Sequence, residues 1–357
     1  PNAAEHVSVR TLRGSRRAGS GPGLPWPGLR LGELTAFSLP APAPVPHRRP
    51  SLRSAVRLDR PLKLQGSHCL VTGGSQGIGL EMARDLLQKG AKVTIAARGQ
   101  GKMDEALAEL ATPDRCTSVR MDVSDYASVT KAVAEAEAKF GPVDCAVCCA
   151  GKAYPAILED QTPEECDFMA RVNFLGPVHT AKAVLPGMKE RRRGRILLVS
   201  SMAGQVGIYG FSVYSGSKFA LAGFAQGLQM EVRPHNIRVG VAYPPDTDTP
   251  GWHEENEKKP EITKEVSGAA SLVSAATVAH GMSVGLERGT FCITVGLEGF
   301  LLAILTTGFN PPTSVLKALL ELFMLPLTRI IGLALLGGWN DTVARCVRRD
   351  EAERKGN

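Results

Sequence analysis

A glycine-rich stretch, Thr72-Gly-Gly-Ser-Gln-Gly-Ile-Gly79, constrains the fold of this chain more than any other feature. It follows the apolar run 67–71 and precedes a helical pattern of apolar residues that ends at Gly90. Glycines let the backbone of such a turn approach a ligand closely, and the N-terminus of the next helix offers free N–H groups to anionic oxygens. The order of strand, glycine turn and helix therefore predicts a site for the pyrophosphate of a dinucleotide.

Strands and helices continue to alternate after this turn. The apolar segments predict further strands at 92–97, 118–121, 143–150, 195–199, 237–241 and 290–295, and helices at 102–111, 126–140 and 213–231. Such alternation is typical of a doubly wound parallel sheet. We therefore expect an α/β fold of the Rossmann type over residues 64–296.

The second predicted strand ends at Arg98, where a site that prefers NAD usually has an acidic residue for the ribose 2′-hydroxyl. Arg98 and the nearby Lys102 suit a 2′-phosphate instead, because guanidinium and ammonium groups bind phosphate oxygens strongly. The sequence thus favours NADPH over NADH. The alternative is that Arg98 only opens a solvated helix.

Tyr214 and Lys218 are about one helical turn apart, so both side chains would lie on one face of the predicted helix 213–231. A cation beside a phenol favours the phenolate, which would let Tyr214 exchange a proton at neutral pH. Lowering the pKa of a tyrosine by about three units takes roughly 4 kcal/mol, more than one solvated ammonium supplies. Lys218 therefore needs partial burial or a second cation, and without either the pair is an ordinary amphipathic face.

Several short motifs together resemble the short-chain dehydrogenase/reductase family. They are Thr72-Gly73-x3-Gly77-x-Gly79, Asp122-Val123, Ala150-Gly151, Asn173, Ser201 and Tyr214-x3-Lys218, in this order. The resemblance implies a Rossmann-type enzyme that transfers hydride between a nicotinamide dinucleotide and a ketone.

The same resemblance implies roles for particular residues. Tyr214 would give its proton to the forming alkoxide, and Lys218 would lower the pKa of Tyr214 and hold the nicotinamide ribose. Ser201, with Ser200 as the alternative, would hold the carbonyl oxygen, and Asn173 would hold a water that relays protons to Lys218. The residues expected to line the cofactor, with Asp122 at the adenine, are Gly73, Ser75, Gln76, Gly77, Ile78, Gly79, Arg98, Lys102, Asp122, Tyr214, Lys218 and Thr249.

Two segments depart from the family pattern. Cys148-Cys149 stands where many relatives have two asparagines, so an amide that braces the central sheet is missing. Pro245 and Thr247 replace a glycine and a valine after the sixth strand, which predicts a stiffer loop. Cys145 and Cys148 have the spacing of redox and zinc sites, but no second pair follows at metal spacing, and we interpret them as apolar residues of a buried strand.

The stretches 188–192, 199–205, 228–232 and 242–251 resemble one branch of the family that reduces a long-chain lipid ketone. This closer resemblance implies an NADPH-dependent ketoreductase of sphingolipid metabolism in the endoplasmic reticulum membrane, with its active site facing the cytosol. A retinoid or steroid ketone is an alternative substrate. A dinucleotide-binding scaffold without activity is the non-enzymatic alternative.

Residues 297–340 are apolar, but prolines and charged residues such as Glu321, Pro326 and Arg329 interrupt them. Neither of the two apolar runs, 299–309 and 319–339, reaches the ~18 to 20 uninterrupted residues that a membrane span requires. Three interpretations compete: an interfacial or re-entrant helix pair, a hairpin through the bilayer, and a helix packed on the core or on a second subunit. We expect membrane attachment through 297–340, followed by a charged tail over 341–357.

The positive charge of the chain is concentrated near its start. Residues 1–60 carry ten arginines against three acids and nine prolines by position 50, which predicts a disordered extension, with an import signal as the alternative. Beyond residue 60 bases and acids are equal in number, so we expect no nucleic-acid partner. Apolar faces on the helix of Tyr214 and on 169–188 could pair two subunits of a homo-oligomer.

Overall fold

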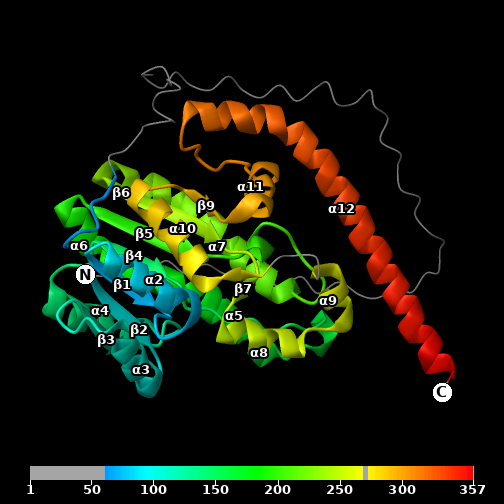
Figure 1. The fold of residues 1–357 in the computed structure, drawn as a ribbon, viewed down its shortest axis with the longest axis horizontal. Coiled ribbons are helices and arrows are strands. Elements are labelled where there is room, and N and C mark those ends of the chain that lie inside the picture. The colour runs from blue at the N-terminus through cyan, green and yellow to red at the C-terminus, as the bar shows by residue number, and fades with distance from the viewer. Residues whose placement is uncertain (1–60, 268–271, 357) are drawn as a thin grey trace, which may run out of the picture. The chain divides into compact units, whose positions relative to one another are not determined.

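A parallel sheet forms the centre of the computed structural model, which describes residues 61–267 and 272–356. Its strand order is β3-β2-β1-β4-β5-β6-β9 (Figure 1). The strands are β1 (His68–Thr72), β2 (Lys92–Ala97), β3 (Cys116–Arg120), β4 (Cys145–Cys148), β5 (Gly194–Val199), β6 (Ile237–Tyr243) and β9 (Cys292–Thr294). The predicted doubly wound α/β fold is confirmed, while the predicted extension 1–60 lies outside the described residues.

Helices cover both faces of the sheet. One face packs against α2 (Gly77–Gln88), α3 (Gln100–Leu110) and α10 (Ala275–Arg288), and the other against α4 (Tyr126–Phe140), α6 (Gly176–Arg191) and α7 (Ser212–Val232). Along β1, Leu70 packs into the core under α4, α6 and α7. Its neighbours Cys69 and Val71 pack into the core under α2, α3 and α10. Strands buried on both faces are apolar at every position, which is why they are visible in the sequence as continuous apolar runs.

Local signals fix the ends of several helices. Asp125 caps α4 by accepting hydrogen bonds from the N–H groups of Ala127 and Ser128, and Gly141, with φ of +82°, follows its end. α4 therefore has the predicted bounds. The remaining short elements are η1 (Leu158–Asp160), η3 (Met202–Gly204), η4 (Arg233–His235), β7 (Thr247–Asp248), α8 (Pro250–Lys258), α9 (Glu261–Ser267) and β8 (Val273–Ser274).

The predicted continuous helix 169–188 is instead three elements. Helix α5 (Pro163–Ala170) leads into a π-helical turn, η2 (Arg171–Leu175), and then into α6. A π-helical turn widens the helix by one residue and is common at functional sites. Here it contains Asn173.

The apolar C-terminal region folds into α11 (Gly296–Leu305) and α12 (Val315–Gly356). α12 is one continuous helix through Pro326 and across the predicted boundary at 340, so the interruptions counted in the sequence do not end it. Figure 1 shows α12 bent, and Pro326 accounts for a bend because it removes one backbone N–H from the helix.

Within the described residues, α12 is the one helix whose length and composition would allow it to cross a membrane, and only 6% of its most apolar window is buried. α11 would extend about 15 Å, half the hydrocarbon thickness of a bilayer, so two spanning helices in a hairpin do not fit. The C-terminal half of α12 packs on α9, where Cys346 contacts Ile262 and Val266 and Arg349 pairs with Glu265 at 3.1 Å.

Candidate active site

The strand order reverses between β2 and β4 on either side of β1, and sites of doubly wound sheets lie at such a point. The Thr72 hydroxyl at the end of β1 accepts hydrogen bonds from the backbone N–H groups of Cys149 (3.1 Å) and Ala150 (3.3 Å), which follow β4. Thr72 thus braces the corner that lacks the family's asparagines. Cys145 and Cys148 are buried in β4, as predicted for apolar strand residues.

The glycine turn leaves a hollow at this point. A Cβ atom on Gly73, whose φ is +68°, would lie 2.8 Å from the backbone of Ala150, and one on Gly79 would lie 2.2 Å from the carbonyl oxygen of Gly73. No side chain caps the N-terminus of α2, so its first N–H groups are available to anionic oxygens. These features fit the pyrophosphate of a dinucleotide.

Cations gather beyond β2, where the ribose of such a cofactor would lie. Lys102 donates a hydrogen bond to Gln76 Oε1 at 2.9 Å, and the Arg98 guanidinium stacks over the Phe168 ring at 5.6 Å. Both cations line the cavity together with Asp122. Their charge and position suit a nicotinamide dinucleotide.

Asp122 is held as a carboxylate. Burial raises its pKa, but hydrogen bonds from the Ser124 hydroxyl (2.6 Å) and N–H (2.9 Å), with the charge of Arg98, outweigh burial and lower the pKa below its usual value. A fixed acceptor at this edge can bind the amino group of an adenine.

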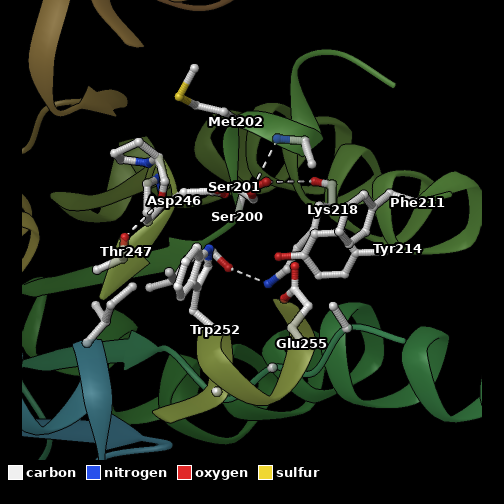
Figure 2. A pocket seen from close by; sticks show the side chains of 18 of the residues that line it. Ser200, Ser201, Met202, Phe211, Tyr214, Lys218, Asp246, Thr247, Trp252 and Glu255 are labelled. Atoms are coloured by element: carbon white, nitrogen blue, oxygen red, sulfur yellow. Dashed lines mark hydrogen bonds between the residues drawn. The ribbon is translucent and has the colours of Figure 1, made fainter. Parts of the chain in front are cut away.

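Tyr214 and Lys218 lie on α7 and both line the cavity (Figure 2). Lys218 Nζ is 5.7 Å from the centre of the Tyr214 ring and donates to the carbonyl oxygen of Val199 at 2.9 Å. The Ser201 hydroxyl hydrogen-bonds with the Tyr214 side chain. The structure therefore brings these three predicted residues together.

Burial controls the protonation of this pair. It raises the pKa of Tyr214 well above its ordinary value, with a further rise from the carboxylate of Glu255, and the Ser201 hydrogen bond compensates only in part. Burial also lowers the pKa of Lys218 to about 8. Burial thus disfavours the charged form of both groups, and the role of Lys218 in lowering the pKa of Tyr214 stays a prediction. Tyr214 keeps its proton at neutral pH, which is the form that a proton donor requires.

The two adjacent serines point in different directions. Ser200 is buried and donates to the carbonyl oxygen of Lys218 at 3.0 Å, so it joins β5 to α7. A Cβ atom on Gly204 would lie 2.2 Å from the Ser200 hydroxyl, which explains the glycine at this spacing. Ser201 accepts from Ala203 N–H at 3.2 Å and is the serine that meets Tyr214.

Asn173 is fully buried beside the site. Its amide donates to the carbonyl oxygen of Lys152 (2.9 Å) and to Ser217 (3.1 Å), and its oxygen accepts from Lys152 N–H (2.9 Å). A methyl group on Gly151 would lie 3.2 Å from Lys218 Nζ and 3.3 Å from the Asn173 oxygen. Asn173 and Lys218 therefore border one small space at Gly151.

Thr249 lies where the loop after β6 crosses the glycine turn. Its hydroxyl caps α8 by accepting from Trp252 N–H at 3.1 Å, and its methyl group would be 3.1 Å from a Cβ atom on Gly77. The hydroxyl can still donate its own hydrogen to a ligand. With Ser75, Ile78 and the other predicted cofactor residues, Thr249 lines the cavity.

The polar residues of the cavity wall that were not predicted from the sequence include Asp246, Trp252, Glu255 and Lys259. Trp252 and Glu255 are three residues apart on α8, a spacing that the sequence displays. Because α8 is short and mostly polar, its sequence has no periodic pattern of apolar residues that would indicate which face lines the cavity.

One cavity of about 1280 Å³ joins the glycine turn, Tyr214 and the C-terminal helices. Its far end is mostly apolar and is lined from α11 and α12 by Leu301, Leu302, Leu305, Ile331, Leu335, Leu336 and Trp339, with Glu298, Thr328 and Arg329 also in the wall. The arrangement can hold a dinucleotide, a carbonyl group at Tyr214 and a long apolar chain.

Comparisons with known proteins agree with this geometry. The model of the family described as short chain dehydrogenase matches residues 67–260. The chain is 42% identical to 3-dehydrosphinganine reductase of Danio rerio over 82% of this chain and 90% of that protein, and 42% identical to 3-ketodihydrosphingosine reductase of Bos taurus over 81% and 89%. The crystal structure of gox2181 superposes with a TM-score of 0.61 at 25% identity, covering 66% of this chain and 98% of that one. On these matches and the fold, the chain belongs to the short chain dehydrogenase family.

Proposed function

We propose that this protein reduces 3-ketosphinganine to sphinganine with NADPH. The observation that carries the proposal is the continuous cavity, which has Tyr214, Ser201 and the glycine turn at one end and the apolar residues of α11 and α12 at the other. A long-chain ketone needs the first end for its carbonyl group and the second for its hydrocarbon chain. Relatives with this activity in their names match over most of the chain, which supports the same substrate.

The protein's own residues account for the proton. NADPH, when bound, supplies the hydride to the ketone carbon. Tyr214, neutral because it is buried, donates its proton to the ketone oxygen, which Ser201 and Tyr214 hold by hydrogen bonds. Lys218 favours the tyrosinate that remains by its charge, and a water in the space between Lys218 and Asn173 would return the proton.

The direct test is turnover by the purified protein with NADPH and 3-ketosphinganine, followed by mass spectrometry of the product. Tyr214→Phe should reduce turnover by about 100- to 10,000-fold, because it removes the proton donor and little volume. NADPH binding, measured by nicotinamide fluorescence, should persist. Tyr126→Phe, which changes a tyrosine outside the cavity, is the matched control, and substantial turnover by Tyr214→Phe would reject the mechanism.

Retinoid and steroid ketones belong in the same assay as competitors. They share the reacting group but are rigid and bulky, whereas the cavity runs from Tyr214 to α12. We expect 3-ketosphinganine to have the highest kcat/KM of the panel. A higher value for a steroid or retinoid would change the assigned substrate, and no turnover of any ketone would favour an inactive scaffold.

The preference for NADPH rests on Arg98 and Lys102. Arg98→Ala should lower the ratio of kcat/KM for NADPH to that for NADH by about 10- to 100-fold, because a charge-assisted bond to the 2′-phosphate is lost. Arg120→Ala, an exposed arginine at the end of β3, is the control. An unchanged ratio in Arg98→Ala would show that the 2′-phosphate is held elsewhere.

We further propose that α12 attaches the protein to the endoplasmic reticulum membrane with the active site on the cytosolic side. Support comes from the exposed apolar half of α12 and from the lipid substrate. Because α12 also lines the cavity and its polar end packs on α9, an interfacial position explains its contacts better than a crossing. Fractionation with protease protection of intact microsomes tests both the membrane and the side.

A further inference from the structure

A cluster of charged residues faces the cavity beside Tyr214 and has no role in the mechanism above. It consists of Asp246, in the loop after β6, Glu255, on α8, and Lys259, just after α8. Lys259 Nζ lies 3.6 Å from an Asp246 oxygen and 3.9 Å from a Glu255 oxygen. Two carboxylates thus share one ammonium, and the cluster carries one negative charge in excess when all three are ionised.

Lys259 is held away from the open part of the cavity. Its side chain is 3% exposed, and Nζ lies over the rings of Trp252 and Phe211 at 5.6 and 5.7 Å. These contacts fix the cation where it is. It therefore compensates the two carboxylates.

Glu255 points toward the reacting groups. Figure 2 shows its carboxylate directed at Tyr214 and Lys218, and it acts electrostatically on both. Its side chain is only 20% exposed, and burial raises its pKa to about 7, although Lys259, Lys152 and Lys218 act against this rise and Asp246 adds to it. A half-buried carboxylate whose neighbours only partly compensate its charge is stabilised further by a cationic ligand.

The proposed substrate supplies a cation that matches this carboxylate. It carries an amine on the carbon next to the ketone and a hydroxyl on the carbon after that. With the ketone oxygen at Tyr214 and Ser201, the amine nitrogen must lie two bonds from the reacting carbon, which is the region that the Glu255 carboxylate faces.

We infer that Glu255, supported by Asp246 and Lys259, forms a subsite for the ammonium group of an α-amino ketone and selects such substrates over plain ketones. This inference rests on the proposed function and assigns Glu255 a role in specificity.

The test compares two substrates of equal chain length, 3-ketosphinganine and its analogue with hydrogen in place of the amine. The wild-type protein should prefer the amine by about 10- to 100-fold in kcat/KM, the range of one hydrogen bond to a charged group. Glu255→Gln, which keeps the shape of the side chain, should lose this preference by lowering kcat/KM for the amine alone, mostly through KM. Glu255→Asp should keep part of it.

Glu257→Gln on the same helix, exposed and outside the cavity, is the control and should match the wild type. Equal losses on both substrates in Glu255→Gln, or a wild-type protein that turns over both equally well, would overturn the subsite while leaving the ketoreductase intact. A wild-type protein that reduces neither substrate would reject the proposed function itself. The wild-type comparison needs no variant, so it stands even where a substitution impairs folding.

Discussion

At the scale of single residues, the site depends on the half-buried Tyr214 lying beside the buried Lys218. Loss of solvent disfavours both the tyrosinate and the ammonium. The phenol of Tyr214 therefore stays neutral, and the pKa of Lys218 is lowered to about 8. The neutral phenol suits the direction of ketone reduction. For alcohol oxidation the same residue would have to lose a proton that burial retains.

Lys218 gives this site a pH limit. Its ammonium is charged below pH 8 and becomes neutral as the pH rises above 8, since burial has moved the folded-state pKa below the ordinary value. We expect kcat/KM for NADPH, which reports ionisations of the free protein, to fall by about tenfold per pH unit above pH 8. A stopped-flow or steady-state profile from pH 6 to 10 measures this.

The matched variant for the pH profile is Lys218→Arg. A guanidinium stays charged throughout this range, so whatever activity the variant retains should lack the alkaline decline. A wild-type profile that stays level to pH 9.5 would contradict the assignment of the limit to Lys218.

At the scale of elements, the glycine turn and α2 set the binding geometry, because the turn leaves no room for side chains. Gly79→Ala would place its Cβ 2.2 Å from the carbonyl oxygen of Gly73, so the turn must open. We expect the affinity for NADPH to fall at least about tenfold and the melting temperature to decrease. Fluorescence titration and thermal unfolding measure the two effects.

Gly101→Ala is the control for this turn. Gly101 lies inside α3 with no atom within 4 Å of its would-be Cβ, so alanine should raise stability by about 0.5 to 1 kcal/mol and leave NADPH binding unchanged. If Gly79→Ala bound NADPH as tightly as Gly101→Ala, the glycine turn would not be the pyrophosphate site.

The sequence predicts those elements whose type and ends are determined by residues close to them in the chain. The bounds of α4 follow from Asp125 and Gly141, and the strands follow from burial on both faces. Tertiary packing decides the rest. The π-helical turn at Asn173 has no sequence signature, and the inward face of α8, with Glu255, is set by the loop that precedes it. α12 also continues through Pro326, although in the sequence this proline interrupts the apolar run.

At the scale of the whole molecule, the exposed apolar side of α12 is the feature that a water-filled environment does not explain. Phe323 and Ile330 are 77% and 66% exposed and lie two turns apart on one face. Phe323→Asp combined with Ile330→Asp should shift the protein from the membrane pellet to the supernatant, because each charge costs up to about 2.5 to 3.5 kcal/mol in hydrocarbon.

Met230→Asp, which changes an exposed methionine near the end of α7, is the control for fractionation. It should leave the distribution unchanged. If the double variant pelleted as the wild type does, another part of the chain would hold the membrane.

Ile331, Leu335 and Leu336 line the cavity while about half of each side chain remains exposed. With α12 in the proposed interfacial position, a hydrocarbon chain that enters from a leaflet exchanges one hydrocarbon-like medium for another, so its transfer has a free energy near zero. Chain length would then influence affinity weakly, and discrimination would fall on the few polar atoms at the head of the lipid.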